Sequence, residues 1–303
     1  MKIHVATVEY LRYLRYDCNY SEETMKTRHK VIGYLTMFWF DREIESITLR
    51  DITDLKESML RRNCKPSYIN KFLQAVCCIL KFCKKHLHLT VLNQKEIEFV
   101  KVPRRNIEYL KDNQIKLILN FLSGDRLCDY RNRAIMATIL DSGMRISECL
   151  RLSRKKHYQR IMEEGRCDII GKGNKERTVF FNRWSKKFIR EYIEKRIDDH
   201  DAMFIAHCHD SRWKTRRLLP DGFRKYLRDF KRLYGFQANP HKQRKTAINN
   251  WKNKGMKPKD ASLTAGHDKL ETTEKYYFGT DWDLLQGEHE KYSYYDVFDD
   301  LTY

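Results

Sequence analysis

Apolar residues between positions 67 and 85 recur at the three- and four-residue spacing of a helix that is buried along one face. They are Ile69, Phe72, Leu73, Val76, Ile79, Leu80 and Phe82. A strand cannot use this spacing, because it presents alternate residues to the same face. The pattern therefore predicts a helical core for this part of the chain.

Helices are expected through most of residues 1–95. The first spans 7–15, the second follows the N-cap Ser21, the third spans 49–62, and the fourth begins near Ser67. Glu22 and Glu23 suit the positive end of the second helix. Pro66 separates the third helix from the fourth, because proline disfavours a helical conformation in the residue before it.

The net charge of the chain indicates which kind of molecule it binds. The net charge is +19 and the sequence pI is about 9.5, which favours a nucleic-acid-binding protein. An acidic protein or an anionic membrane surface is the alternative. No apolar run approaches the roughly 18 residues of a membrane span, and the N-terminus has no secretory pattern. We expect a cytoplasmic protein.

The nine cysteines are scattered and form no paired CxxC motifs with metal-ligand spacing. Cys77, Cys78 and Cys83 lie in the apolar helical run, where cysteine serves as a small hydrophobic residue. The sequence therefore predicts free thiols in a reducing compartment and no metal site.

Residues 96–106 are predicted to be a linker, and Pro103 fits an extended path. Arg104 and Arg105 would contact phosphates if this segment crosses a duplex. The last segment, 281–303, has the opposite charge, with seven acidic residues against Lys291. It is expected to pack on the basic body of the chain or on a neighbouring copy.

The second domain is predicted to combine helices with one β-hairpin. Strands are expected at 167–170 and 177–181 around the glycine-rich turn 171–176. The expected helices span 113–122, 131–141, 146–152, 185–197, 221–233, 242–252 and 271–278. The fold class is therefore mainly α with a small β-hairpin.

Arg145 and Arg244 are the candidates for binding a phosphate. A phosphodiester under attack gains negative charge on its non-bridging oxygens, and a guanidinium donates two charge-assisted hydrogen bonds to such oxygens. Two arginines can stabilise this species without a metal ion. Glu148 lies one helical turn after Arg145 and is expected to hold its guanidinium. Taken alone, that pair is more often a surface salt bridge.

Lysine and histidine can carry the protons. Lys172 and Lys175 lie in the hairpin turn, where a lysine can protonate the departing 5′ oxygen once nearby arginines lower its pKa from about 10.4. A merely soluble turn would contain the same lysines. His241 precedes Arg244 by three residues, so a helix places both on one face. There His241 can accept a proton from a nucleophile.

A tyrosine that follows the Gly266-His267 turn is the candidate nucleophile. Cationic neighbours stabilise a phenolate, whose usual pKa is about 10. His267 precedes Tyr276 by nine residues, a distance that a turn and about one and a half helical turns can span. Spacing does not choose between Tyr276 and Tyr277.

These motifs resemble the tyrosine recombinase (phage integrase) family. They are Arg145 in SGMRISE, Lys172 in GKGNKER, His241-x-x-Arg244, and AGH followed nine residues later by Tyr276. The resemblance covers nearly the whole chain, in the two-domain layout of Xer and Cre. It implies a four-helix, SAM-like core-binding domain (1–95), the linker (96–106), an α+β catalytic domain (107–280) and an acidic tail (281–303) that contacts a neighbouring protomer.

The resemblance also implies roles. Arg145 and Arg244 clamp the phosphate, Lys172 is the general acid, His241 accepts a proton, His267 contacts the phosphate, and Tyr276, preferred over Tyr277, is the nucleophile. The implied activity is site-specific recombination of double-stranded DNA through a 3′-phosphotyrosine intermediate, with no metal, ATP or other cofactor. The expected assembly is a dimer on each site and a tetramer in synapsis. DNA contacts are expected from Lys65, Lys71, Lys81, Arg104, Arg105 and Lys175.

Two other activities suit the same sequence. A type IB topoisomerase-like enzyme makes the same nick but rejoins the same strand. A DNA-binding regulator would keep the fold without the chemistry. Two positions depart from the family pattern: Lys245 stands where histidine is frequent, and Ala265 stands where leucine is frequent. Neither removes a catalytic group.

Overall fold

The computed structural model describes residues 1–103, 109–171, 175–207, 216–266 and 282–291. The chain divides into two compact units, Met1–Asn106 and Ile107–Tyr303. Among the described residues, none of the helices is both long enough and apolar enough to cross a membrane.

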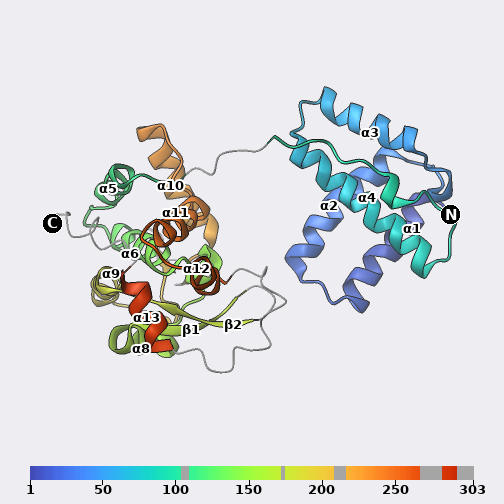
Figure 1. Ribbon diagram of the computed structural model, residues 1–303. Coiled ribbons are helices and arrows are strands. Elements are labelled where there is room, and N and C mark those ends of the chain that lie inside the picture. Colours follow the sequence, from blue (N-terminus) through green and yellow to red (C-terminus); the bar gives the residue numbers. More distant parts are fainter. Residues whose placement is uncertain (104–108, 172–174, 208–215, 267–281, 292–303) are drawn as a thin grey trace. The chain divides into compact units, whose positions relative to one another are not determined.

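The N-terminal unit is built from helices (Figure 1). They are α1 (Ile3–Arg12), α2 (Glu22–Phe38), α3 (Leu49–Arg61) and α4 (Pro66–His86), with short π or 3₁₀ turns η1 (Tyr13–Asp17), η2 (Ile44–Ser46) and η3 (Gln94–Glu96). Helix α4 packs against α1, α2 and α3. All seven apolar residues that define its predicted face are buried, so the predicted helix is confirmed.

Local signals set the beginnings of these helices. At the start of α3, the Thr48 amide donates to Asp51 Oδ2 at 2.8 Å, and the Asp51 amide donates to Thr48 Oγ1 at 3.4 Å. Pro66 occupies the first turn of α4, where its missing amide hydrogen costs nothing. Ser21 precedes α2 as predicted, but its hydroxyl bonds the Thr24 hydroxyl at 3.0 Å and caps no backbone amide.

Part of the segment predicted as the linker is attached to the N-terminal unit. Ile97 is 4% exposed and belongs to its apolar core. Asn70 on α4 donates to the Val100 carbonyl at 2.8 Å and accepts from the Val100 amide at 2.9 Å. Asn70 thus satisfies both backbone groups of Val100 and holds this part of the chain against α4.

The C-terminal unit is a mainly helical body with two small sheets. Its elements are α5 (Asp112–Phe121), α6 (Leu127–Ser142), α7 (Ile146–Cys149), η4 (Arg154–Tyr158), α8 (Gln159–Glu164), β1 (Arg166–Ile170), β2 (Glu176–Phe180), α9 (Arg183–Glu194), β3 (Ile205–Ala206), β4 (Arg216–Arg217), α10 (Pro220–Tyr234), α11 (Pro240–Asn253), α12 (Pro258–Ala265) and α13 (Trp282–Lys291). Strands β1 and β2 pair antiparallel, with Ile170 opposite Glu176. The predicted hairpin and the predicted fold class are confirmed.

Helix α6 is the centre of this unit and packs against α9 and α11. Every residue from 131 to 142 is buried, so its polar side chains need internal partners. The Asp141 carboxylate accepts from the Asn182 amide at 2.6 Å, the Asn182 side chain at 2.5 Å and the Ser185 hydroxyl at 2.6 Å. These bonds fasten the beginning of α9 to α6.

Among the described residues, the three helices α8, α12 and α13 were not predicted from the sequence. Helix α12 begins with Pro258 and ends at Gly266, which has the left-handed φ of 66°. Helix α13 lies within the acidic tail and packs on its own unit. His289 in α13 is fully buried, and its Nε2 lies 2.9 Å from the Asp141 carbonyl. Its ring also packs against Phe180 and Trp251. The helix expected at 271–278 lies outside the described residues.

Two glycines of this unit allow a matched test of packing. Gly143 (φ 61°) and Gly235 (φ 75°) both end helices in the left-handed region. A Cβ at Gly143 would lie 2.5 Å from Cη2 of the buried Trp251, whereas a Cβ at Gly235 would have no atom within 4 Å. We expect Gly235→Ala to lower the free energy of unfolding by about 1–2 kcal/mol through backbone strain alone, and Gly143→Ala to lower it clearly more.

Urea unfolding of the two variants, followed by circular dichroism and tryptophan fluorescence, measures this difference. Equal losses would show that Trp251 moves aside without cost.

Candidate active site

Three arginines hold the C-terminal end of α12. The last carbonyls of a helix have no partners within it. Here Thr264 O accepts from Arg177 Nη1 at 3.0 Å, Ala265 O from Arg244 Nη2 at 2.7 Å, and Gly266 O from Arg145 Nη2 at 3.5 Å. Cations are also favoured there by the helix dipole. Side chains from β2, α11 and the residue before α7 therefore meet at three successive carbonyls.

Glu148 joins two of these arginines. Its Oε1 accepts from Arg145 Nη1 at 2.9 Å, and its Oε2 accepts from Arg177 Nη2 at 2.7 Å and from the Arg145 amide at 2.8 Å. The Glu148 side chain is 1% exposed. Burial tends to raise the pKa of Glu148, but Arg177 and Arg145 outweigh burial and hold that pKa below its usual value. Glu148 therefore stays ionised.

Gly266 is required where α12 meets Arg177. Its φ of 66° lies in the left-handed region. A Cβ there would stand 2.5 Å from Nε and 2.6 Å from Cδ of Arg177. The backbone thus approaches the Arg177 side chain more closely than any other residue type permits.

Arg244 ties α12 to the end of α6. Its Nη1 donates to the Gly143 carbonyl at 2.5 Å, and the residue is 4% exposed. Arg244 lies in the second turn of α11. The start of this helix is set by Pro240 and by the Asn239 side chain, which accepts from the Lys242 amide at 2.9 Å. Burial, together with the charges of Arg145 and Arg177, lowers the pKa of Arg244 to about 10. It remains charged at neutral pH.

The cluster has more positive than negative charge. Burial lowers the pKa of Arg177, against the opposing effect of Glu148. In the part of the chain that the structure describes, Glu148 is the one carboxylate that forms an ion pair within this cluster, with Arg145 and Arg177. Arg145 is the most open of them, with 33% of its side chain exposed. The net surplus of two positive charges, reachable from solvent at Arg145, makes a site for an anion.

His241 lies in the first turn of α11, one turn before Arg244. Its side chain is exposed. Partial burial, followed by the charges of Lys245, Arg244 and Arg145, lowers the pKa of His241 below its usual value. The imidazole is therefore neutral at pH 7 and able to accept a proton.

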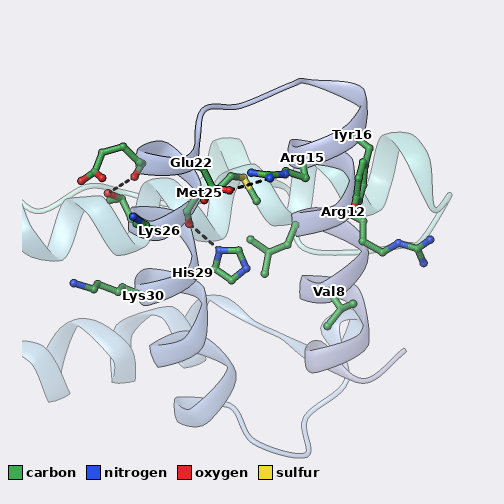
Figure 2. A pocket seen from close by; sticks show the side chains of 12 residues that line it. Val8, Arg12, Arg15, Tyr16, Glu22, Met25, Lys26, His29 and Lys30 are labelled. Carbon is green, nitrogen blue, oxygen red and sulfur yellow. Dashed lines mark hydrogen bonds and ion pairs between the residues drawn. The ribbon is translucent and has the colours of Figure 1, made fainter. Parts of the chain in front are cut away.

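A second basic surface lies on the N-terminal unit. A cavity of about 850 Å³ opens between α1 and α2 (Figure 2). The cations lining it are Arg12, Arg15, Lys26 and Lys30. Arg15 is paired with Glu22 at 2.9 Å. On α4, the predicted DNA-contacting lysines Lys71 and Lys81 are exposed, and so is Lys65 just before it.

Several predicted site residues lie outside the described residues: Lys172, His267, Tyr276, Arg104 and Arg105. Lys175 is described, is exposed, and closes the hairpin turn by accepting the Gly171 amide at 2.7 Å. The structure brings together Arg145, Glu148, Arg244 and, through its charge interactions, His241. Among the described residues, no group of three or more His, Cys, Asp or Glu side chains is placed to hold a metal ion.

Arg177 and the end of α12 were not predicted from the sequence as parts of the site. In the predicted hairpin, Arg177 is only the first residue of a strand. Its pairing with Ile169 and the resulting direction of its side chain required the strand register. The signal that was present is the Gly266 position, since a glycine at a helix end can mark a close approach as well as a turn.

Residues 108–281 match the phage integrase family. The chain is 24% identical over 281 residues to the tyrosine recombinase XerC of Lactobacillus delbrueckii subsp. bulgaricus, covering 88% of this chain and 92% of that protein. It is 26% identical over 284 residues to XerC of Rickettsia rickettsii, covering 88% and 89%.

The fold is similar to solved integrase structures. The Tn1549 transposon integrase in complex with circular intermediate DNA has a TM-score of 0.70 at 17% identity, over 95% of this chain and 99% of that chain. A lambda integrase dimer bound to a COC′ core site has a TM-score of 0.71 at 14% identity, over 88% and 96%. A lambda integrase tetramer bound to a Holliday junction has a TM-score of 0.69 at 14% identity, over 92% and 81%.

The charge environment of His241 gives a testable pKa. Lys245→Gln removes a neighbouring cation, so the pKa of His241 should rise toward its usual value of about 6.5. NMR titration of the histidine Cε1–H signals measures it, with the His241 signal assigned by His241→Gln. Lys242→Gln is the matched control, because Lys242 is not among the groups that shift this pKa. A larger rise in the control would show that the field at His241 has another source.

Proposed function

Because this chain belongs to the phage integrase family, we propose that its arginine cluster binds the phosphate at which DNA is cut, and that Tyr276 attacks it. The protein is a tyrosine recombinase, a strand-transferring enzyme of site-specific DNA recombination. Cleavage leaves a 3′-phosphotyrosine bond and a free 5′ hydroxyl. A 5′ hydroxyl of the partner duplex then attacks that bond.

The observation that carries this proposal is the surplus of positive charge around Arg145. The guanidiniums of Arg145, Arg177 and Arg244 are fixed before any ligand arrives, because the carbonyls at the end of α12 and Glu148 already hold them. Donors that are prearranged toward developing charge need no reorganisation during the reaction. A pentacoordinate phosphate supplies the negative charge that the cluster lacks.

The remaining roles follow from charge and protonation. Arg145 and Arg244 are assigned to the non-bridging oxygens. His241, neutral at pH 7, is assigned to accept the phenol proton. Lys172 is assigned as general acid for the 5′ oxygen and His267 as a further phosphate contact, both by their positions in the family motifs. No step in this scheme consumes ATP, because the phosphotyrosine ester retains the energy of the broken bond.

The proposed assembly is a dimer on each recombination site and a tetramer during strand exchange. Lambda integrase forms both, as a dimer on a core site and as a tetramer on a Holliday junction. The chain would act in the cytoplasm, in association with DNA. Phosphate contacts are assigned to Lys65, Lys71, Lys81, Arg104, Arg105 and Lys175, which are basic side chains of the kind that bind DNA without reading sequence.

Covalent trapping tests the function and recovers the DNA site in the same experiment. Randomised duplexes containing a nick are incubated with the protein, and covalent complexes are isolated under denaturing conditions and sequenced. We expect enrichment of one motif with the wild type and with Tyr277→Phe. Tyr276→Phe should yield no covalent complex, because its side chain lacks the attacking oxygen.

Each other result is informative. A complex with Tyr276→Phe but not with Tyr277→Phe would move the nucleophile by one residue. If the wild type and both variants bind DNA but none of the three forms a covalent complex, the chain is a regulator. Relaxation of plasmids that lack the recovered site would indicate a topoisomerase.

The face of α4 that contacts DNA can be found from salt dependence. We expect Lys71→Ala to weaken binding to all sequences and to reduce the slope of log K against log salt by about 0.9. Arg61 on α3 is the control, because Glu57 already pairs with it at 2.6 Å and no DNA contact is assigned to it, so Arg61→Ala should leave the slope unchanged. Fluorescence anisotropy over a salt series measures both variants. A change with Arg61→Ala alone would place α3, and not the Lys71 face of α4, on DNA.

A further inference from the structure

Each of the three nitrogens of the Arg177 guanidinium lies against protein. Its Nη1 donates to Thr264 O, its Nη2 donates to Glu148, and its Nε is buried with no hydrogen-bond partner among the described residues. That Nε lies against Gly266. Only 12% of the side chain is exposed, compared with 33% for Arg145. Arg177 is therefore less open to a phosphate than Arg145, and its charged partner within the cluster is Glu148.

Glu148 is the group through which Arg177 acts. The carboxylate sits between two guanidiniums at 2.9 and 2.7 Å, so its single negative charge is divided between them. If Arg177 were absent, Glu148 would face Arg145 alone, and would neutralise the arginine that is most open to a ligand. Opposite charges at this separation interact strongly when they are shielded from water.

We propose that Arg177 is a positioning residue of the strand-transfer reaction, which keeps Arg145 available to the phosphate by sharing the Glu148 carboxylate. This inference rests on the proposed function. In this role Arg177 sets the charge balance of the cluster. This differs from stabilising the fold and from contacting the phosphate directly. With Arg177 the four side chains carry a surplus of two positive charges, and without it the surplus is one.

Charge balance predicts a rescue that the other two roles do not. Arg177→Met should slow formation of the covalent complex about tenfold or more, while DNA affinity stays within about threefold, since electrostatic donors act mainly on the transition state. Adding Glu148→Gln restores the surplus to two charges, and its amide oxygen can still accept from the Arg145 backbone. The double variant should recover at least about threefold in rate.

The experiment uses a nicked duplex bearing the DNA motif recovered by covalent trapping, with single-turnover rates from denaturing gels and folding checked by circular dichroism. A double variant as slow as Arg177→Met, or slower, would overturn the proposal, and so would a wild-type rate for Arg177→Met. If Arg177→Met does not fold, Arg177→Lys decides. An ammonium keeps the charge beside Glu148, so a rate within about threefold of wild type is expected, and a loss of tenfold or more would overturn the proposal.

A second readout separates this inference from the proposed function. Inorganic phosphate is titrated into the protein without DNA, and the His241 NMR signal is followed. Phosphate affinity should fall with Arg177→Met and rise again with added Glu148→Gln. If the wild type forms no covalent complex with any DNA, the function is wrong, yet this order of affinities still decides whether Arg177 shares the carboxylate. An unchanged affinity for phosphate across the variants would refute the sharing.

Discussion

The end of α12 is the junction on which the site depends. Three carbonyls that a helix leaves without partners receive three guanidiniums from distant parts of the chain. The interaction is mutual: the arginines complete the helix end, and the helix end fixes the arginines. A charged cluster of this kind would be costly to bury around a flexible loop, because each donor would have to find an acceptor at the moment of burial.

The surrounding structure makes that junction possible. The buried Asp141 fastens α9 to α6, and α6 ends at Gly143, whose carbonyl takes the second nitrogen of Arg244. Gly143 also allows Trp251 to pack against the chain. Glu148 then compensates one of the three positive charges and leaves two. The fold thus prepares a binding site for negative charge whose most exposed member is Arg145.

The acidic tail combines a strongly charged sequence with a buried contact. Its sequence is strongly charged, yet its described part contains a helix whose His289 is fully buried against Phe180 and Trp251. The same Trp251 lies against Gly143. Helix α13 is therefore connected through two buried rings to the backbone that holds Arg244. The charge of the tail suggested a contact on the surface of the basic body or of a neighbouring copy. The described part of the tail instead packs inside its own unit, through the buried side chain of His289.

The sequence by itself determined the helical character of α4, the hairpin, the fold class and the family. These depend on apolar periodicity, turn residues and motifs of a few residues, all of which are local. It also identified Arg145, Glu148, Arg244 and His241 as candidates. Only the tertiary structure revealed Arg177, because its role depends on a strand register and on contacts with Glu148 and Thr264, 29 and 87 residues away. Contacts formed by long-range packing produce no repeating pattern in the sequence. They can be identified only in the folded structure, where the end of α12 and the arginines lie together.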